Sequence, residues 1–182
     1  YTTHTNTNLT PTKCRPVHER FIPVIRKRAP NLVIFSDQWR AEALPYLEQT
    51  VVEIRQHTGA SVLVLGPNFE LRRDPRILLR DVQNPSDINN VAWARRKKDR
   101  EKVAESLRRI SEAIPVDYIS KFDIVCPQGR CDILLQDQLS YSDGNHWTVK
   151  GMELFGQRLV NHPVFVELVT SGENRQPPVV GD

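Results

Sequence analysis

The chain has 182 residues, of which 39% are hydrophobic and 26% are charged, as expected of one globular domain that buries a core. Its net charge of +3 is too small an excess to indicate a nucleic-acid-binding protein. No apolar run approaches the ~18 residues that a membrane-spanning helix needs.

The apolar pattern predicts helices and strands in alternation. Residues 1–12 are rich in threonine and asparagine and predict an irregular start. The elements expected after it are a helix over 16–28, a strand over 32–35, a helix over 42–57, a strand over 61–65, a surface loop over 67–86, a long helix over 87–114, a strand over 116–119 and a last helix over 148–160. The domain is therefore expected over 13–169, followed by a disordered tail over 170–182.

The strands over 32–35 and 61–65 are continuous apolar runs, which is typical of parallel strands covered on both faces. Strand–helix–strand connections place helices on both sides of such a sheet. Functional sites of open parallel sheets lie outside the carboxyl ends of the strands. The segments at 35–39 and 66–67 follow two of these ends.

Asp143 and His146 form the most informative motif, because a carboxylate stands three residues before a histidine on a loop that leads into a helix. A carboxylate bonded to one ring nitrogen fixes the imidazole tautomer, and the other nitrogen can then take a proton from a nucleophile. The spacing alone is also compatible with a loop aspartate that caps a helix beside a solvated histidine.

Cys126 and Cys131 flank a Pro-Gln-Gly-Arg stretch that suits a tight turn. A disulfide is the favoured interpretation, and it indicates an oxidising compartment. Two free thiols and a redox or zinc site are the alternatives, although zinc normally takes four ligands and no second cysteine pair is present. Cys14 is left over.

Four separated signals resemble the SGNH-hydrolase domain that is fused to bacterial membrane O-acyltransferases of the acyltransferase-3 group. They are the strand that ends in Ser36-Asp-Gln-Trp39, the strand that ends in Gly66-Pro67, the Cys126–Cys131 loop, and a Tyr-x-Asp-x-x-His motif at Tyr141, Asp143 and His146. The resemblance runs from about Cys14 to about Val166. It implies a flavodoxin-like three-layer α/β/α sandwich with a parallel sheet.

The resemblance also implies a serine nucleophile in a Gly-Asp-Ser-His block on the first strand, and this sequence has no such block. The chain is therefore expected to lack the first strand or strands of the fold, with the serine supplied upstream. A relative that has lost its nucleophile is the other possibility. Ser36, Ser140 and Ser142 are poor substitutes by their positions in the sequence. In the family a cysteine at the place of Cys14 pairs with another one upstream.

The function implied by the resemblance is O-acyl transfer, of acetyl above all, or ester hydrolysis at sugar hydroxyls of a cell-surface glycan. His146 is then the general base and acid and Asp143 its orienting residue. The expected partners are a glycan or acylated sugar and a fused or associated membrane acyltransferase domain, with no cofactor, metal or nucleic acid. The expected location is periplasmic or extracellular, within a membrane-anchored protein. A non-catalytic glycan-binding or scaffolding domain on the same fold is the alternative.

Trp39 and Gln38 are further candidates for the acyl pocket or the oxyanion hole, which backbone N–H groups can also supply. Trp39 is equally compatible with a packing role. The basic run at 95–100 predicts a solvated helix face, or else a contact for anionic polysaccharide or lipid headgroups.

Overall fold

The computed structural model describes residues 21–173, which form two compact units. The first, the sheet unit, comprises residues 21–66, 106–119 and 163–173. The second comprises residues 67–105 and 120–162, and we call it the dyad unit because it contains Asp143 and His146, the dyad. The predicted irregular start, Cys14 and most of the predicted tail lie outside the described residues.

The sheet unit is built on three parallel strands in the order β1-β2-β3. β1 (Leu32–Ser36) pairs with β2 (Ser61–Leu65), and β2 pairs with β3 (Asp117–Ile119). β2 is central, and four of its five residues are buried, which explains its continuous apolar sequence. The three predicted strands are therefore present, each within one residue of its expected bounds.

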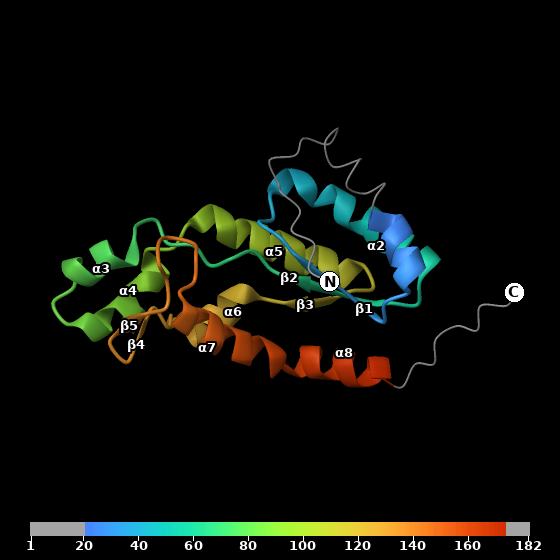
Figure 1. Ribbon diagram of the computed structural model, residues 1–182. Coiled ribbons are helices and arrows are strands. Elements are labelled where there is room, and N and C mark those ends of the chain that lie inside the picture. The colour runs from blue at the N-terminus through green and yellow to red at the C-terminus, as the bar shows by residue number, and fades with distance from the viewer. Residues whose placement is uncertain (1–20, 174–182) are drawn as a thin grey trace, which may run out of the picture. The chain divides into compact units, whose positions relative to one another are not determined.

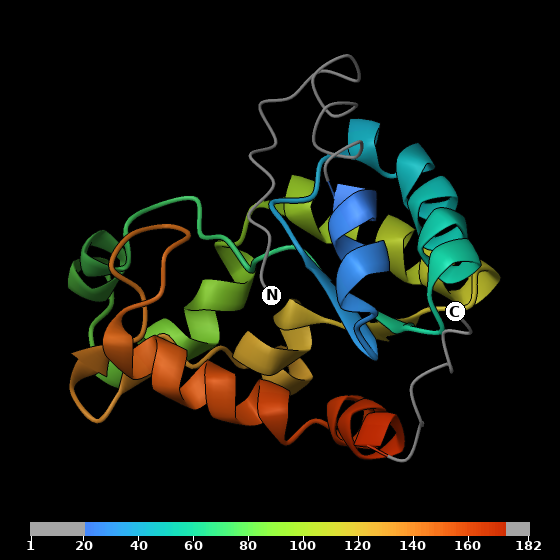
Figure 2. The same ribbon diagram turned by 45° about the vertical axis from the view of Figure 1, so that its right-hand side comes forward.

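Helices cover both faces of this sheet (Figure 1 and Figure 2). α2 (Pro45–His57) and the second half of α5 (Lys98–Ala113) lie on one face, and α8 (Pro163–Glu173) lies on the other. A short 3-10 turn, η1 (Ala41–Ala43), precedes α2, because Pro45 starts a new helix there. The three-layer α/β/α arrangement predicted from the sequence is confirmed. A helix is also present over 21–28, inside the predicted 16–28.

The dyad unit holds the shorter elements, joined by long connections. In chain order they are α3 (Pro75–Asp81), η2 (Pro85–Asp87), α4 (Ile88–Ala94), the start of α5, α6 (Lys121–Val125), η3 (Pro127–Gly129), β4 (Leu134–Leu135), β5 (Gln138–Leu139) and α7 (Val149–Val160). β4 and β5 form a small antiparallel hairpin. No helix within residues 21–173 is both long enough and apolar enough to cross a bilayer.

Two predictions for the dyad unit are wrong. The segment 67–86 is not all loop, because Asp74 caps α3 by accepting a bond from the Arg76 N–H, with Pro75 at the first helical position. The long helix predicted over 87–114 is broken between α4 and α5. Residues 95–97 there leave the helix and pair with residues 70–72 through an isolated antiparallel bridge, Leu71 to Arg96.

At the other end of the chain α8 was not predicted, and it continues to Glu173, four residues into the expected tail.

An aromatic cluster fills the core of the dyad unit. Phe69 lies at its centre and packs against Trp93, Phe122 and Tyr141, and Phe155 of α7 packs against Tyr141. Phe69, Tyr141 and Phe155 are fully buried. This core lies directly beneath the loop that joins β5 to α7.

A disulfide joins Cys126 and Cys131, which confirms the favoured interpretation of that pair. Both cysteines are buried, between α6 and β4. Asn89 of α4 holds the segment that follows, since its side-chain oxygen accepts bonds from the N–H groups of Ile133 and Leu134.

Candidate active site

Asp143 and His146 are in direct contact on the loop between β5 and α7. His146 Nδ1 lies 2.7 Å from Asp143 Oδ2. The second carboxylate oxygen, Oδ1, accepts bonds from the backbone N–H groups of Asn145 at 2.8 Å and His146 at 2.9 Å. One carboxylate therefore shapes the turn and holds the imidazole ring at the same time.

The hydrogen bond from the Asn145 N–H, together with those from the His146 side chain and N–H, lowers the pKa of Asp143 to about 2. The carboxylate is thus ionised at every pH at which the protein would work. An ionised orienting group favours the tautomer with the proton on Nδ1, which leaves Nε2 as the basic nitrogen.

The ring of His146 faces solvent, with 69% of its side chain exposed, and the Asp143 side chain is 46% exposed. Among residues 21–173, Nε2 of His146 has no hydrogen-bond partner. The open nitrogen is accessible to a nucleophile and a substrate, which is what a general base requires.

Residues 69–71, which follow β2, hold the loop that carries Asp143 and His146 through two hydrogen bonds. The Leu71 N–H donates to the Gly144 carbonyl at 2.7 Å, and the buried Tyr141 hydroxyl donates to the Phe69 carbonyl at 3.0 Å. Burial raises the pKa of Tyr141, so the phenol stays protonated and keeps this bond. Residues 69–71 therefore fix the loop on both sides of Asp143.

Gly144 allows the close approach of this segment, since a Cβ there would stand 3.0 Å from the Leu71 carbonyl oxygen. The sequence did not indicate the role of residues 69–71, because they lie about seventy positions from the motif and contribute mainly backbone groups.

The N-terminus of α7 fixes the other end of the loop between β5 and α7. Thr148 caps the helix through its hydroxyl, which accepts a bond from the Gly151 N–H, and its own N–H donates to the Ser140 carbonyl. Gly151 packs against that same carbonyl so closely that a Cβ would lie 2.1 Å from the oxygen. Only glycine fits at this contact.

The Gly151→Ala variant is expected to lose about 1–3 kcal/mol of unfolding free energy, because the Ser140 backbone must move to admit a methyl group. Gly156→Ala on the same helix is the matched control. No atom lies within 4 Å of a Cβ there, so helix propensity should leave its stability unchanged or raise it by up to about 1 kcal/mol. Thermal unfolding of both variants is the measurement, and equal stability of the two would contradict the close contact.

The other two candidates, Trp39 and Gln38, belong to the sheet unit. Trp39 is buried in the sheet unit, and its indole N–H donates to the Leu65 carbonyl at 2.7 Å, at the carboxyl end of β2. This bond favours the packing interpretation of Trp39. Gln38 is exposed on the same loop. The expectation that both share a rim with the dyad stays a prediction.

Two serines near the dyad are engaged with backbone groups. Ser140 is fully buried and donates to the carbonyls of Asp132 and Ile133, and Ser142 donates to the His146 carbonyl. Neither hydroxyl is bonded to Nε2 of His146. The expectation that the nucleophile lies elsewhere stays a prediction.

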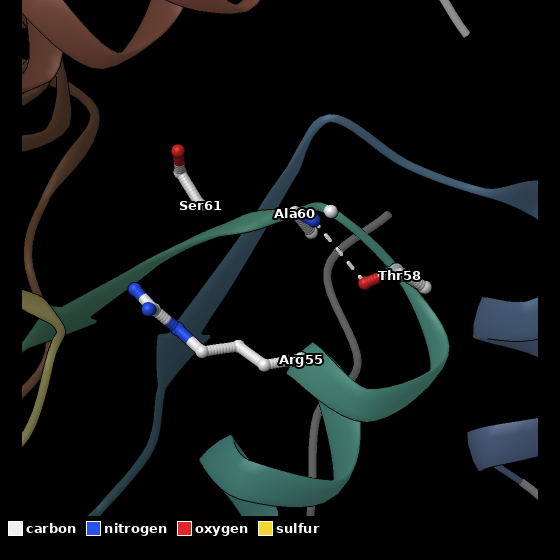
Figure 3. Close-up of a pocket in the computed structure, with 5 residues that line it drawn as sticks. Arg55, Thr58, Ala60 and Ser61 are labelled. Atoms are coloured by element: carbon white, nitrogen blue, oxygen red, sulfur yellow. Dashed lines mark hydrogen bonds between the residues drawn. The ribbon is translucent and has the colours of Figure 1, made fainter. Parts of the chain in front are cut away.

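The sheet unit also has an open hollow of about 310 Å³, lined by Arg55, Thr58, Ala60 and Ser61 (Figure 3). Thr58 accepts a bond from the Ala60 N–H within it, and the Arg55 guanidinium is bound to the Pro115 carbonyl. The hollow lies where β2 begins, at the amino end of the sheet, whereas sites of parallel sheets lie at the carboxyl ends. It is therefore not the candidate active site.

Comparison with known proteins agrees with this architecture. The family model described as "SGNH domain (fused to AT3 domains)" matches residues 2–161. Among solved structures, the periplasmic domain of a lipopolysaccharide acetyltransferase from Salmonella ser. Paratyphi A is similar, with a TM-score of 0.68 and 14% sequence identity. The similarity covers 80% of this chain and 61% of that domain, so the chain spans less than two thirds of its structural neighbour. No curated protein matches the sequence.

The family match spans most of the chain, and the structural neighbour has the same fold. The chain belongs to the family of SGNH domains that are fused to AT3 domains.

Proposed function

We propose that this domain transfers an acyl group, acetyl above all, to or from a sugar hydroxyl of a cell-surface glycan. The observation that carries the proposal is the exposed Nε2 of His146, held ready by a bond between Nδ1 and the ionised Asp143. That arrangement is the base half of a Ser-His-Asp mechanism.

His146 Nε2 accepts the proton of a serine hydroxyl as its oxygen attacks the ester carbonyl of the acyl donor. The imidazolium, stabilised by Asp143, then gives this proton to the departing alcohol, and an acyl-serine remains. In the second half, water or a sugar hydroxyl attacks the acyl-serine and loses its proton to the same nitrogen, which then returns the proton to the serine oxygen as the acyl–serine bond breaks. Water gives hydrolysis and a sugar hydroxyl gives transfer, with no metal or organic cofactor in either step.

In this proposal the serine comes from a Gly-Asp-Ser-His block upstream of this chain, as the family resemblance implies. Ser140 and Ser142 are bound to backbone groups. The fusion to AT3 domains in the family favours transfer over hydrolysis, with a membrane acyltransferase domain that supplies the acyl group. The same fusion, together with the disulfide, supports a periplasmic or extracellular place within a membrane-anchored protein.

The test uses the encoded protein at full length, incubated with 4-nitrophenyl acetate and analysed by mass spectrometry. We expect one acetyl group on a serine of the full-length protein, and none in the His146→Ala variant. Acetylation at the same rate without His146, or no acetylation while a glycan still binds, would support the non-catalytic glycan-binding alternative instead.

A further inference from the structure

The positive charge of the chain is concentrated beside the dyad. Segment 67–100 holds nine lysines and arginines against five aspartates and glutamates, an excess of four, whereas the whole chain has a net charge of +3. The proposed acyl transfer does not use this charge.

Carboxylates neutralise part of the segment. The five basic residues that lie against a carboxylate are Arg73, Arg76, Arg96, Lys97 and Arg100. The four that have no carboxylate partner within residues 21–173 are Arg72, Arg80, Arg95 and Lys98. All four are exposed.

Arg72 and Arg95 are neighbours beside the isolated bridge. The Arg72 N–H donates to the Arg95 carbonyl at 2.9 Å, one position along from the Leu71–Arg96 pair. Arg95 is the C-cap residue of α4, and Leu71 is buried in the core, whereas the side chains of Arg72 and Arg95 are both exposed. Two like charges on residues joined by a backbone hydrogen bond repel each other.

The guanidinium of Arg72 is also held in place by a hydrogen bond. The Arg72 Nε–H donates to the Arg96 carbonyl at 3.1 Å, which holds the guanidinium over the bridge and leaves its terminal nitrogens for a ligand. A phosphate or carboxylate between the two guanidinium groups would accept bidentate bonds and remove their mutual repulsion.

Residues 70–72 also contact the loop that carries Asp143 and His146. Leu71 donates to Gly144, which stands between Asp143 and His146, while residues 95–97 pair with the segment's opposite edge. Gly144 and Arg95 therefore bond to two consecutive residues of this segment, Leu71 and Arg72.

We propose that Arg72 and Arg95 form an anion-binding site beside the dyad that takes the phosphate or carboxylate group of an acidic glycan. This inference names a substrate class, acidic glycans, for the proposed acyl transfer, and it depends on that proposed function. An acidic glycan fits better than a membrane surface, because carboxylates neutralise most of the surrounding basic residues and leave a local pair rather than a broad cationic face.

The test is an NMR titration of the chain with glucose 6-phosphate, with glucose as the neutral probe. We expect saturable shifts of the Arg72 and Arg95 amide signals with the phosphorylated sugar and none with glucose. Arg72→Gln/Arg95→Gln should raise the Kd at least about tenfold, since each guanidinium loses a charge-assisted bond. Lys27→Gln/Lys102→Gln removes the same charge at exposed positions elsewhere and should leave the Kd unchanged.

Equal affinity of the arginine double variant, or shifts of equal size with glucose, would overturn the inference. So would tight binding to phosphatidylglycerol vesicles, retained in the double variant, without any binding of glucose 6-phosphate. His146→Ala should bind the sugar phosphate as the parent chain does. If the proposed function is wrong, the full-length parent protein is not acetylated, or is acetylated equally well without His146, while binding of the sugar phosphate stays intact.

Discussion

The Asp143→Asn variant of the full-length protein should lose about 10,000-fold in the rate of aryl acetate hydrolysis while it keeps its fold. An asparagine at this position can still accept the bonds from the Asn145 and His146 N–H groups through its amide oxygen, so the turn survives. Its NH₂ group would then face His146 Nδ1 as a donor. The imidazole would respond with the proton on Nε2, where it can no longer act as a base.

Asp137→Asn is the matched control for that substitution. Asp137 is exposed in the turn between β4 and β5 with a φ of 67°, a conformation that asparagine tolerates well. The control should hydrolyse the ester at the parent rate. The orienting role of Asp143 would be refuted by a loss of less than about tenfold in Asp143→Asn with an unchanged fold.

Replacement of Glu70 by alanine should cost about 3 kcal/mol of unfolding free energy, the largest loss that we expect from any charged residue of the dyad unit. The Glu70 side chain is only 3% exposed. Its two oxygens lie 2.9 Å from Lys97 Nζ and 2.8 Å from Arg100 Nε, so one buried carboxylate balances two cations. Truncation leaves both cations beside a cavity without their counter-charge.

The loss should reach the dyad as well, because Glu70 precedes Leu71, whose N–H holds Gly144. Urea unfolding of Glu70→Ala measures the effect, with Glu153→Ala as the control. Glu153 pairs with Lys150 on the open face of α7 at 3.5 Å with 63% of its side chain exposed, so its removal should change stability by less than about 1 kcal/mol. If the two variants unfold at the same urea concentration, the buried ion-pair cluster has no structural role.

The sequence was informative where local pattern and tertiary structure agree. The runs at 32–35 and 61–65 predicted β1 and β2 because strands covered on both faces need apolar side chains at every position. The contact between Asp143 and His146 was predictable for a similar reason, since three residues of loop suffice to bring both side chains together.

Prediction failed where distant segments decide the local structure. The break between α4 and α5 depends on residues 70–72, which draw residues 95–97 into a bridge, and the helical pattern through that stretch gave no sign of it. α3 was missed for another reason. The arginines and Pro75 of this segment favour a loop by composition, although an aspartate before a proline is a helix start signal. The role of Glu70 was not predictable from the sequence, because its partners Lys97 and Arg100 lie about thirty positions further along the chain, just before and within the first turn of α5.

Whether Asp143 sets the tautomer of His146 can be measured on this chain by ¹⁵N NMR of the histidine side chains. We predict that neutral His146 carries its proton on Nδ1, facing Asp143 Oδ2, with Nε2 unprotonated, and that Asp143→Asn reverses this preference. If neutral His146 instead holds its proton on Nε2 in the parent chain, the carboxylate does not steer the imidazole and the proposed mechanism is wrong.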